Sequence, residues 1–156
     1  MLEVTIPSRG LLRLEYLVLD VNGTIALDGQ LLPGVRERLD RLGEALETWL
    51  VSADTHGTLA ELADALQVKW RRLKQGGEAE QKAAFVQKLG AERVVAIGNG
   101  ANDAAMLQRA ALGIAVLGGE GLAAVCLTAA DVIAPSIESA LDLLLCPRRL
   151  IATLRM

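Results

Sequence analysis

The chain has 156 residues, of which 52% are hydrophobic and 22% charged, and its formal net charge is -3. These proportions exclude an intrinsically disordered chain, and the slightly acidic balance argues against nucleic acid as a partner. No apolar stretch approaches the roughly 20 residues that cross a bilayer, and the first residues lack the features of a signal peptide. We therefore expect a single domain over residues 1–156, located in the cytoplasm, with no membrane partner.

The first third of the chain predicts a hairpin followed by a buried strand. Residues 2–6 and 11–15 are expected to pair around a turn, and the second strand is expected to run on to Asp20. Residues 16–20 form a short apolar run that ends at a turn signal, which is typical of a central parallel strand. Asp28-Gly29 predicts a small hairpin flap within residues 25–32.

The rest of the chain alternates between helical and strand patterns. The expected helices cover residues 33–46, 59–66, 78–89, 104–111, 120–128, 137–145 and 148–155. The expected strands cover residues 48–51, 68–73 (an edge strand), 93–97, 113–117 and 131–134. This alternation predicts an α/β fold, an open parallel sheet with helices on both faces.

Three of the apolar strands end in polar clusters. They are Asp20-Val21-Asn22-Gly23-Thr24, Ser52-Ala53-Asp54, and Gly98-Asn99-Gly100-Ala101-Asn102-Asp103. Each cluster alone has an ordinary structural explanation, since Asp before Asn-Gly forms turns and Ser caps helices. In a parallel sheet, however, the carboxyl ends of the strands meet at one edge, where open α/β sheets bind ligands.

The order of these clusters resembles the haloacid dehalogenase superfamily of phosphatases and phosphotransferases. The segment from Gly98 to Leu107, with Ala110 and Leu112-Gly113-Ile114-Ala115-Val116, is similar to the GDGxNDxxxLxxAxxGIA motif of that group. Within it, the resemblance is strongest to the phosphorylation domain of P-type ATPases and to soluble P-type-ATPase-like proteins. The resemblance implies a Rossmann-like core, here without a cap domain.

The resemblance and the chemistry of phosphoryl transfer together assign roles to these residues. Asp20 would be the nucleophile, and Mg²⁺ would screen the repulsion between its carboxylate and a phosphate. The expected catalytic residues are Asp20, Asn22, Ser52 and Lys82. The expected phosphate-binding residues are Gly23, Thr24, Ser52, Ala53, Lys82 and Asn102. The expected metal ligands are Asp20, Asn22 (through its carbonyl), Asn99 and Asp103.

Several of these assignments have competitors in the sequence. Lys74 and Lys88 compete with Lys82, which is favoured because similar proteins keep a lysine at the start of the helix before the last motif. Asp54 could bind near the site or cap the following helix, and surface or capping duty is the simpler interpretation of His56, the one histidine.

Two departures from the family pattern concern charge. Asn22 stands where the phosphatases usually carry a general acid, and an amide cannot exchange a proton at neutral pH. General acid–base help typically contributes a factor of about 100 to 10,000. Asn99 stands where the family usually has the metal-binding Asp, so we expect weaker Mg²⁺ binding.

The sequence therefore predicts a Mg²⁺-dependent phosphohydrolase, slowed by Asn22, that acts through an aspartyl phosphate on Asp20. The alternatives are a phosphate- or nucleotide-sensing or partner-binding module, and a phosphotransferase. Without a cap the site should be open to a phosphorylated small molecule or a phosphoprotein. The apolar C-terminal segment 140–154 could pack on the core or form a homo-oligomer.

Overall fold

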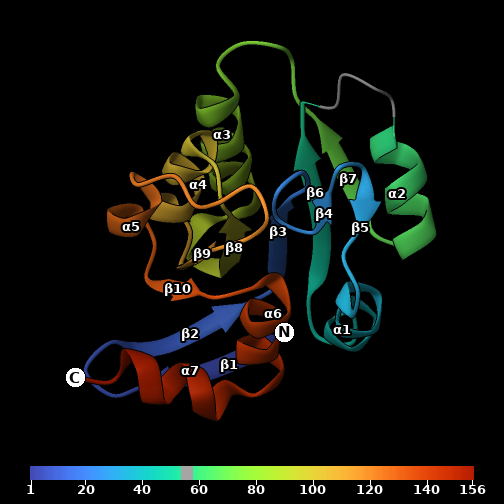
Figure 1. The fold of residues 1–156 in the computed structure, drawn as a ribbon. Helices are drawn as coiled ribbons and strands as arrows, with labels where there is room; N and C mark the ends of the chain where they lie inside the picture. Colours follow the sequence, from blue (N-terminus) through green and yellow to red (C-terminus); the bar gives the residue numbers. More distant parts are fainter. Residues whose placement is uncertain (54–57) are drawn as a thin grey trace.

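A computed structural model describes residues 1–53 and 58–156, so Asp54 and His56 lie outside the described residues. Its centre is a six-stranded sheet in the order β10-β9-β8-β3-β6-β7, in which every neighbouring pair is parallel (Figure 1). The strands are β3 (Tyr16–Asp20), β6 (Glu47–Ser52), β7 (Lys69–Arg72), β8 (Val94–Gly98), β9 (Leu112–Val116) and β10 (Val132–Ala134). The predicted open parallel sheet is confirmed.

Helices cover both faces of this sheet. The helices are α1 (Val35–Leu42), α2 (Thr58–Leu66), α3 (Glu78–Leu89), α4 (Ala104–Arg109), α5 (Cys126–Ala129), α6 (Ile137–Leu145) and α7 (Pro147–Leu154). Successive residues of β3 face opposite sides. Leu17 and Leu19 pack with α1, α2 and α6, whereas Val18 packs with α3, α4 and α5. Both faces of the central strand are therefore buried, which explains its continuous apolar run.

The N-terminal hairpin is separate from the central sheet. β1 (Leu2–Ile6) and β2 (Gly10–Leu14) pair only with each other among the described strands, and α7 packs against β1. The expectation that β2 continues into β3 is wrong. The chain changes sheets at Glu15, whose N–H donates to the Arg93 carbonyl and whose carbonyl accepts from Glu47 N–H.

The predicted flap is present beside the end of β3. β4 (Ala26–Leu27) and β5 (Gln30–Leu31) form a two-stranded hairpin, with φ of 50° at Asp28 and 77° at Gly29. Two central residues with positive φ are the turn that suits a tight hairpin. The edge strand β7 is also confirmed, and all four of its residues are exposed.

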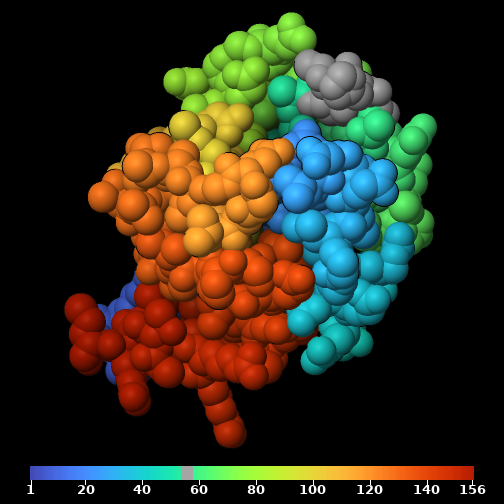
Figure 2. All heavy atoms as spheres, viewed as in Figure 1, coloured from blue at the N-terminus to red at the C-terminus, as the bar shows by residue number. Residues whose placement is uncertain are grey.

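The helix expected over residues 120–128 is much shorter than predicted. Only α5 (Cys126–Ala129) forms, because Gly121 takes φ of +84° and breaks the helical backbone. The irregular segment before α5 lies side by side with the flap segment in Figure 2, orange against light blue. Within residues 1–53 and 58–156, no helix is both long and apolar enough to span a bilayer.

Candidate active site

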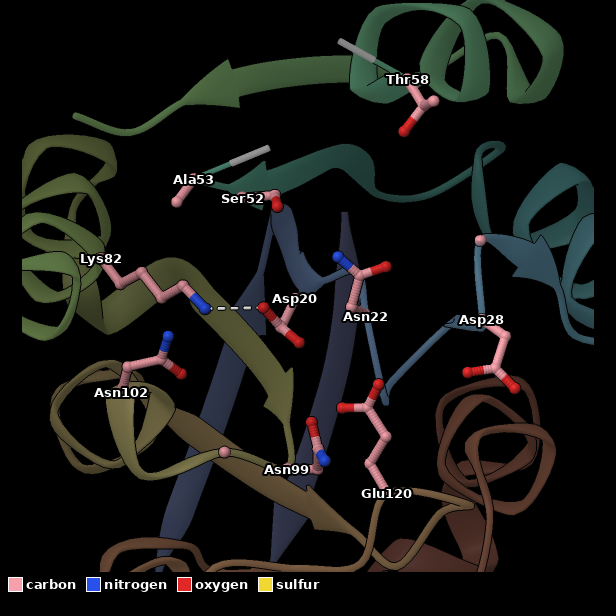
Figure 3. A pocket seen from close by; sticks show the side chains of 12 residues that line it. Asp20, Asn22, Asp28, Ser52, Ala53, Thr58, Lys82, Asn99, Asn102 and Glu120 are labelled. Carbon is pink, nitrogen blue, oxygen red and sulfur yellow. Dashed lines mark hydrogen bonds and ion pairs between the residues drawn. The ribbon is translucent and has the colours of Figure 1, made fainter. Parts of the chain in front are cut away.

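The strand register brings the predicted polar clusters to one edge of the sheet. Asp20, the last residue of β3, pairs with Val51 of β6, so that Ser52 follows at the same edge. On the other side Leu19 pairs with Ile97, and β8 ends one residue later, before Asn99. The side chains converge on an open pocket of about 750 Å³ (Figure 3). Its described lining residues are Asp20, Asn22, Asp28, Gly29, Ser52, Ala53, Thr58, Lys82, Asn99, Gly100, Asn102 and Glu120.

Lys82 is the lysine that reaches Asp20. It projects from α3, is 1% exposed, and its Nζ lies 2.6 Å from Oδ1 of Asp20 and 2.6 Å from Oδ1 of Asp103. The competing Lys74 and Lys88 are both exposed. The structure therefore selects Lys82 among the three lysines that the sequence left open.

Asp103 is fully buried behind the pocket. Its Oδ1 accepts from Lys82, and its Oδ2 accepts from the backbone N–H groups of Asn99 and Gly100 at 3.0 and 2.9 Å. Both carboxylate oxygens are thus used to fix the ammonium and the loop after β8. A direct contact of Asp103 with a metal ion stays a prediction.

Burial and the neighbouring charges shift the pKa values of Asp20 and Lys82. Burial, followed by repulsion from Asp103, raises the pKa of Asp20 from 3.8 to about 6, and Lys82 and Thr24 oppose the rise. Burial lowers the pKa of Lys82, but attraction to the two carboxylates exceeds that effect and raises it overall. Near neutral pH Lys82 is therefore a permanent positive charge beside a mostly ionised Asp20.

The Thr24 hydroxyl lies between the side chains of Asp20 and Asn99. The Thr24 hydroxyl lies 3.0 Å from Oδ2 of Asp20 and 3.2 Å from Oδ1 of Asn99, and its single proton can serve one of them at a time. Nδ2 of Asn99 donates to the Gly121 carbonyl at 3.1 Å. Thr24 is buried, so its hydroxyl orients the carboxylate of Asp20.

The remaining predicted residues differ in their access to the pocket. Asn22, Ser52, Ala53 and Asn102 line it, so they can meet a phosphate there. Gly23, with φ of +79°, is not among the described lining residues. Gly23 allows the backbone a left-handed conformation that residues with a side chain rarely adopt.

Sequence reasoning gave no site role to five of the described lining residues, which are Asp28, Gly29, Thr58, Gly100 and Glu120. The sequence could have predicted a site role for Glu120, because this residue follows the Gly118-Gly119 pair at the end of β9. That pair closes a fourth strand at the edge where the other three polar clusters lie.

The oxygen atoms of the pocket suit a hard divalent cation. Residues with carboxylate and amide side chains line the pocket, and Mg²⁺ usually takes one or two carboxylates with water and substrate phosphate. Since Gly23 has no Cβ, the side chains of Asn99 and Glu120 can approach the backbone that follows Asp20. In the described part of the chain, no group of three or more His, Cys, Asp or Glu residues is arranged to hold a metal.

Comparison with known proteins places this arrangement in a family. A sequence model of haloacid dehalogenase-like hydrolases matches residues 5–111, a span that holds the Asp20–Lys82–Asp103 group. The chain belongs to the haloacid dehalogenase-like hydrolases. The resemblance inferred from the sequence motifs is thereby confirmed.

Individual relatives show what this hydrolase is similar to in sequence and in fold. Protein MJ0073 of Methanocaldococcus jannaschii is 40% identical over 92 residues, which cover 56% of this chain and 99% of MJ0073. The structure of 3-deoxy-D-manno-octulosonate 8-phosphate phosphatase from Moraxella catarrhalis has a TM-score of 0.66 at 16% identity. The match covers 91% of this chain and 94% of that chain.

A second structural neighbour is the catalytic domain of the CPx-ATPase CopB-B. It has a TM-score of 0.60 and 28% identity, and the match covers 74% of this chain and 46% of that chain. The hydrolase therefore has structural likeness both to phosphatases and to the catalytic part of a P-type ATPase.

Proposed function

We propose that this hydrolase is a Mg²⁺-dependent phosphohydrolase that acts through an aspartyl phosphate on Asp20. The observation that carries the proposal is the buried Lys82, which holds Asp20 at the floor of an open pocket. Burying a lysine between two carboxylates costs desolvation free energy. A fixed positive charge that stabilises a bound phosphate explains why the site would keep such a lysine.

In the first step, Oδ2 or Oδ1 of Asp20 attacks the phosphorus atom, and the bond from phosphorus to the leaving oxygen breaks. Lys82 offsets the negative charge that accumulates on Asp20 and the phosphoryl oxygens. Ser52 and Ala53 line the same pocket, so the Ser52 hydroxyl and the Ala53 N–H would be the groups that bind those oxygens. The leaving oxygen takes a proton from solvent. Water then attacks phosphorus and gives up a proton to solvent, the bond between phosphorus and the Asp20 oxygen breaks, and inorganic phosphate and the Asp20 carboxylate are released.

Mg²⁺, when bound, would neutralise charge on the phosphoryl oxygens and on Asp20. The residues that would hold it are Asp20 through its carboxylate, Asn22 through its backbone carbonyl and Asn99 through its side-chain oxygen. Each is a hard oxygen donor of the kind that Mg²⁺ prefers.

The proposed enzyme is slow because Asn22 lines the pocket where the phosphatases of this superfamily usually carry an acid. Its amide can donate a hydrogen bond to the leaving oxygen but cannot give up a proton. The Asn22→Asp variant is expected to raise turnover of p-nitrophenyl phosphate, and of substrates with poorer leaving groups even more. An unchanged rate for both kinds of substrate would contradict this role.

The open pocket supports either a phosphorylated small molecule or a phosphoprotein as substrate. Location in the cytoplasm and assembly into a homo-oligomer stay predictions from the sequence. The missing acid also supports transfer of the phosphoryl group to an acceptor other than water, or a purely sensing role. These alternatives differ from hydrolysis in the product, because only hydrolysis releases inorganic phosphate stoichiometrically.

The decisive experiment measures phosphate release from p-nitrophenyl phosphate and a panel of phosphorylated metabolites, with Mg²⁺ and with EDTA. Wild-type protein is compared with Asp20→Asn and with Asp40→Asn, a control carboxylate on the exposed side of α1. We expect Mg²⁺-dependent release in wild type and Asp40→Asn and its loss in Asp20→Asn. Equal, negligible turnover in all three would refute the proposal.

A further inference from the structure

Glu120, in the loop between β9 and α5, is an acidic pocket residue to which the mechanism above gives no role. In Figure 3 its carboxylate points toward Asn22 and lies near Asn99. A Cβ atom built on Gly23 would lie 2.4 Å from Oε2 of Glu120 and 2.7 Å from Nδ2 of Asn99. The ends of both side chains therefore occupy the space beside the backbone that follows Asp20.

Asn99 holds the loop that carries this carboxylate. Its Nδ2 donates to the carbonyl of Gly121, the residue directly after Glu120, while its Oδ1 lies 3.2 Å from the Thr24 hydroxyl. An Asp at position 99 would have no N–H for that carbonyl, and its charge would repel Glu120. The amide thus permits a carboxylate to approach from the neighbouring loop.

The backbone of the loop is also fixed against the segment after β3. Gly121 N–H donates to the Gly118 carbonyl at 2.9 Å. A Cβ atom on Gly118 would lie 2.9 Å from the Gly23 carbonyl oxygen, and one on Gly119 would lie 2.6 Å from Cδ2 of Leu27. These close approaches agree with the contact between the orange and light-blue segments in Figure 2. The loop therefore presents its carboxylate from a defined position.

The charged residues that line the pocket indicate which ligand the Glu120 carboxylate would bind. Asp20, Asp28 and Glu120 are the described acidic lining residues, and Lys82 is the described basic one. Lys82 already contacts two carboxylates. A phosphate would therefore enter a negatively charged pocket unless a cation came with it.

Resting on the proposed function, we propose that Glu120 provides carboxylate charge to the divalent cation of this site. It does so in place of the Asp that the family pattern carries at position 99. Asn99 is then a positioning residue for the Glu120 loop. The carboxylate would then come from the loop after β9 and not from position 99 at the end of β8. The site would still offer the cation hard oxygen ligands.

The test measures cation affinity without substrate, so it does not depend on turnover. Mn²⁺ binding is followed by the loss of the free-ion EPR signal, and Mg²⁺ binding by calorimetry, at pH 7.5. The variants are Glu120→Gln, the double variant Asn99→Asp/Glu120→Gln, and Glu44→Gln. Glu44 is an exposed residue after α1 that controls for the change in net charge.

We expect Glu120→Gln to weaken Mn²⁺ binding by about tenfold or more, and the double variant to recover most of that loss. Glu44→Gln should stay within about twofold of wild type. Affinity of Glu120→Gln equal to that of a wild-type protein that binds Mn²⁺ would overturn this proposal and leave the proposed function intact. A wild-type protein that binds neither cation would overturn both.

Discussion

Replacement of Asp20 by Asn is expected to stabilise the cation-free protein above pH 6, although it removes the proposed nucleophile. Asp20 is 8% exposed and shares the ammonium of Lys82 with Asp103. The buried group therefore contains two carboxylates and one ammonium. An Asn side chain has nearly the same shape and no charge to desolvate.

The size of the effect follows from the pKa of Asp20, which burial and then Asp103 raise from 3.8 to about 6. A rise of about two pKa units corresponds to about 3 kcal/mol. Because the folded pKa lies above the unfolded one, the folded state holds the proton more tightly. The free energy of unfolding of wild type therefore falls as pH rises from about 4 to about 6. The increase in the free energy of unfolding caused by Asp20→Asn should be small at pH 4 and reach its full size by pH 7.

The assay is urea unfolding with EDTA at pH 4.5 and pH 7.5. Asp40→Asn serves as the matched control, because Asp40 is exposed on α1. Added Mg²⁺ should stabilise wild type more than Asp20→Asn and so narrow their difference at pH 7.5. An Asp20→Asn protein that is less stable than wild type at pH 7.5, or a difference that is equal at both pH values, would refute the reasoning.

Three further predictions concern other parts of the same core. Lys82→Met should destabilise the protein by about 3 kcal/mol at pH 7.5 in urea unfolding, because two buried carboxylates lose their counterion. An unchanged midpoint would contradict this. Gly113→Ala should cost about 2 kcal/mol or more, since its Cβ would lie 2.3 Å from the Leu107 carbonyl oxygen; an unchanged melting temperature would show that β9 can move away. Cys146 is exposed and should react with a thiol reagent at once. Cys126 should react only on unfolding, because it is buried and burial, with Asp103, raises its thiol pKa; two equally fast thiols would argue against this packing.

The central sheet could be predicted from the sequence because each strand is a short apolar run that ends in a turn signal. The position of Asp20 followed from the same pattern, and Lys82 followed from a resemblance to known proteins. The end of β2 before Glu15 could not be predicted, because Glu15 fits the alternation of apolar and polar residues that would continue the strand. Its change of sheet depends on backbone hydrogen bonds to strands far along the chain.

The place of Glu120 in the pocket was missed for a similar reason. Local periodicity favours a helix over residues 120–128, yet the chain turns at Gly121 and packs on the flap. Contacts between a loop and a hairpin about 90 residues earlier leave no periodic signal, since neither segment has a regular repeat. Tertiary contact, which local propensity does not contain, decided this part of the site.

The ion group at the floor of the pocket also has a consequence for folding. Asp20 and Lys82 are 62 residues apart in the chain, and Lys82 and Asp103 are 21 apart. The ammonium cannot be buried before α3 has packed against β3 and the loop after β8 has closed, since an unpaired charge in the interior would be too costly. In a partly folded chain Asp20 is an ordinary solvated carboxylate with no cation beside it. The proposed capacity to accept a phosphoryl group therefore requires the completed fold, and a chain halted during synthesis before β8 would carry Asp20 without its paired ammonium.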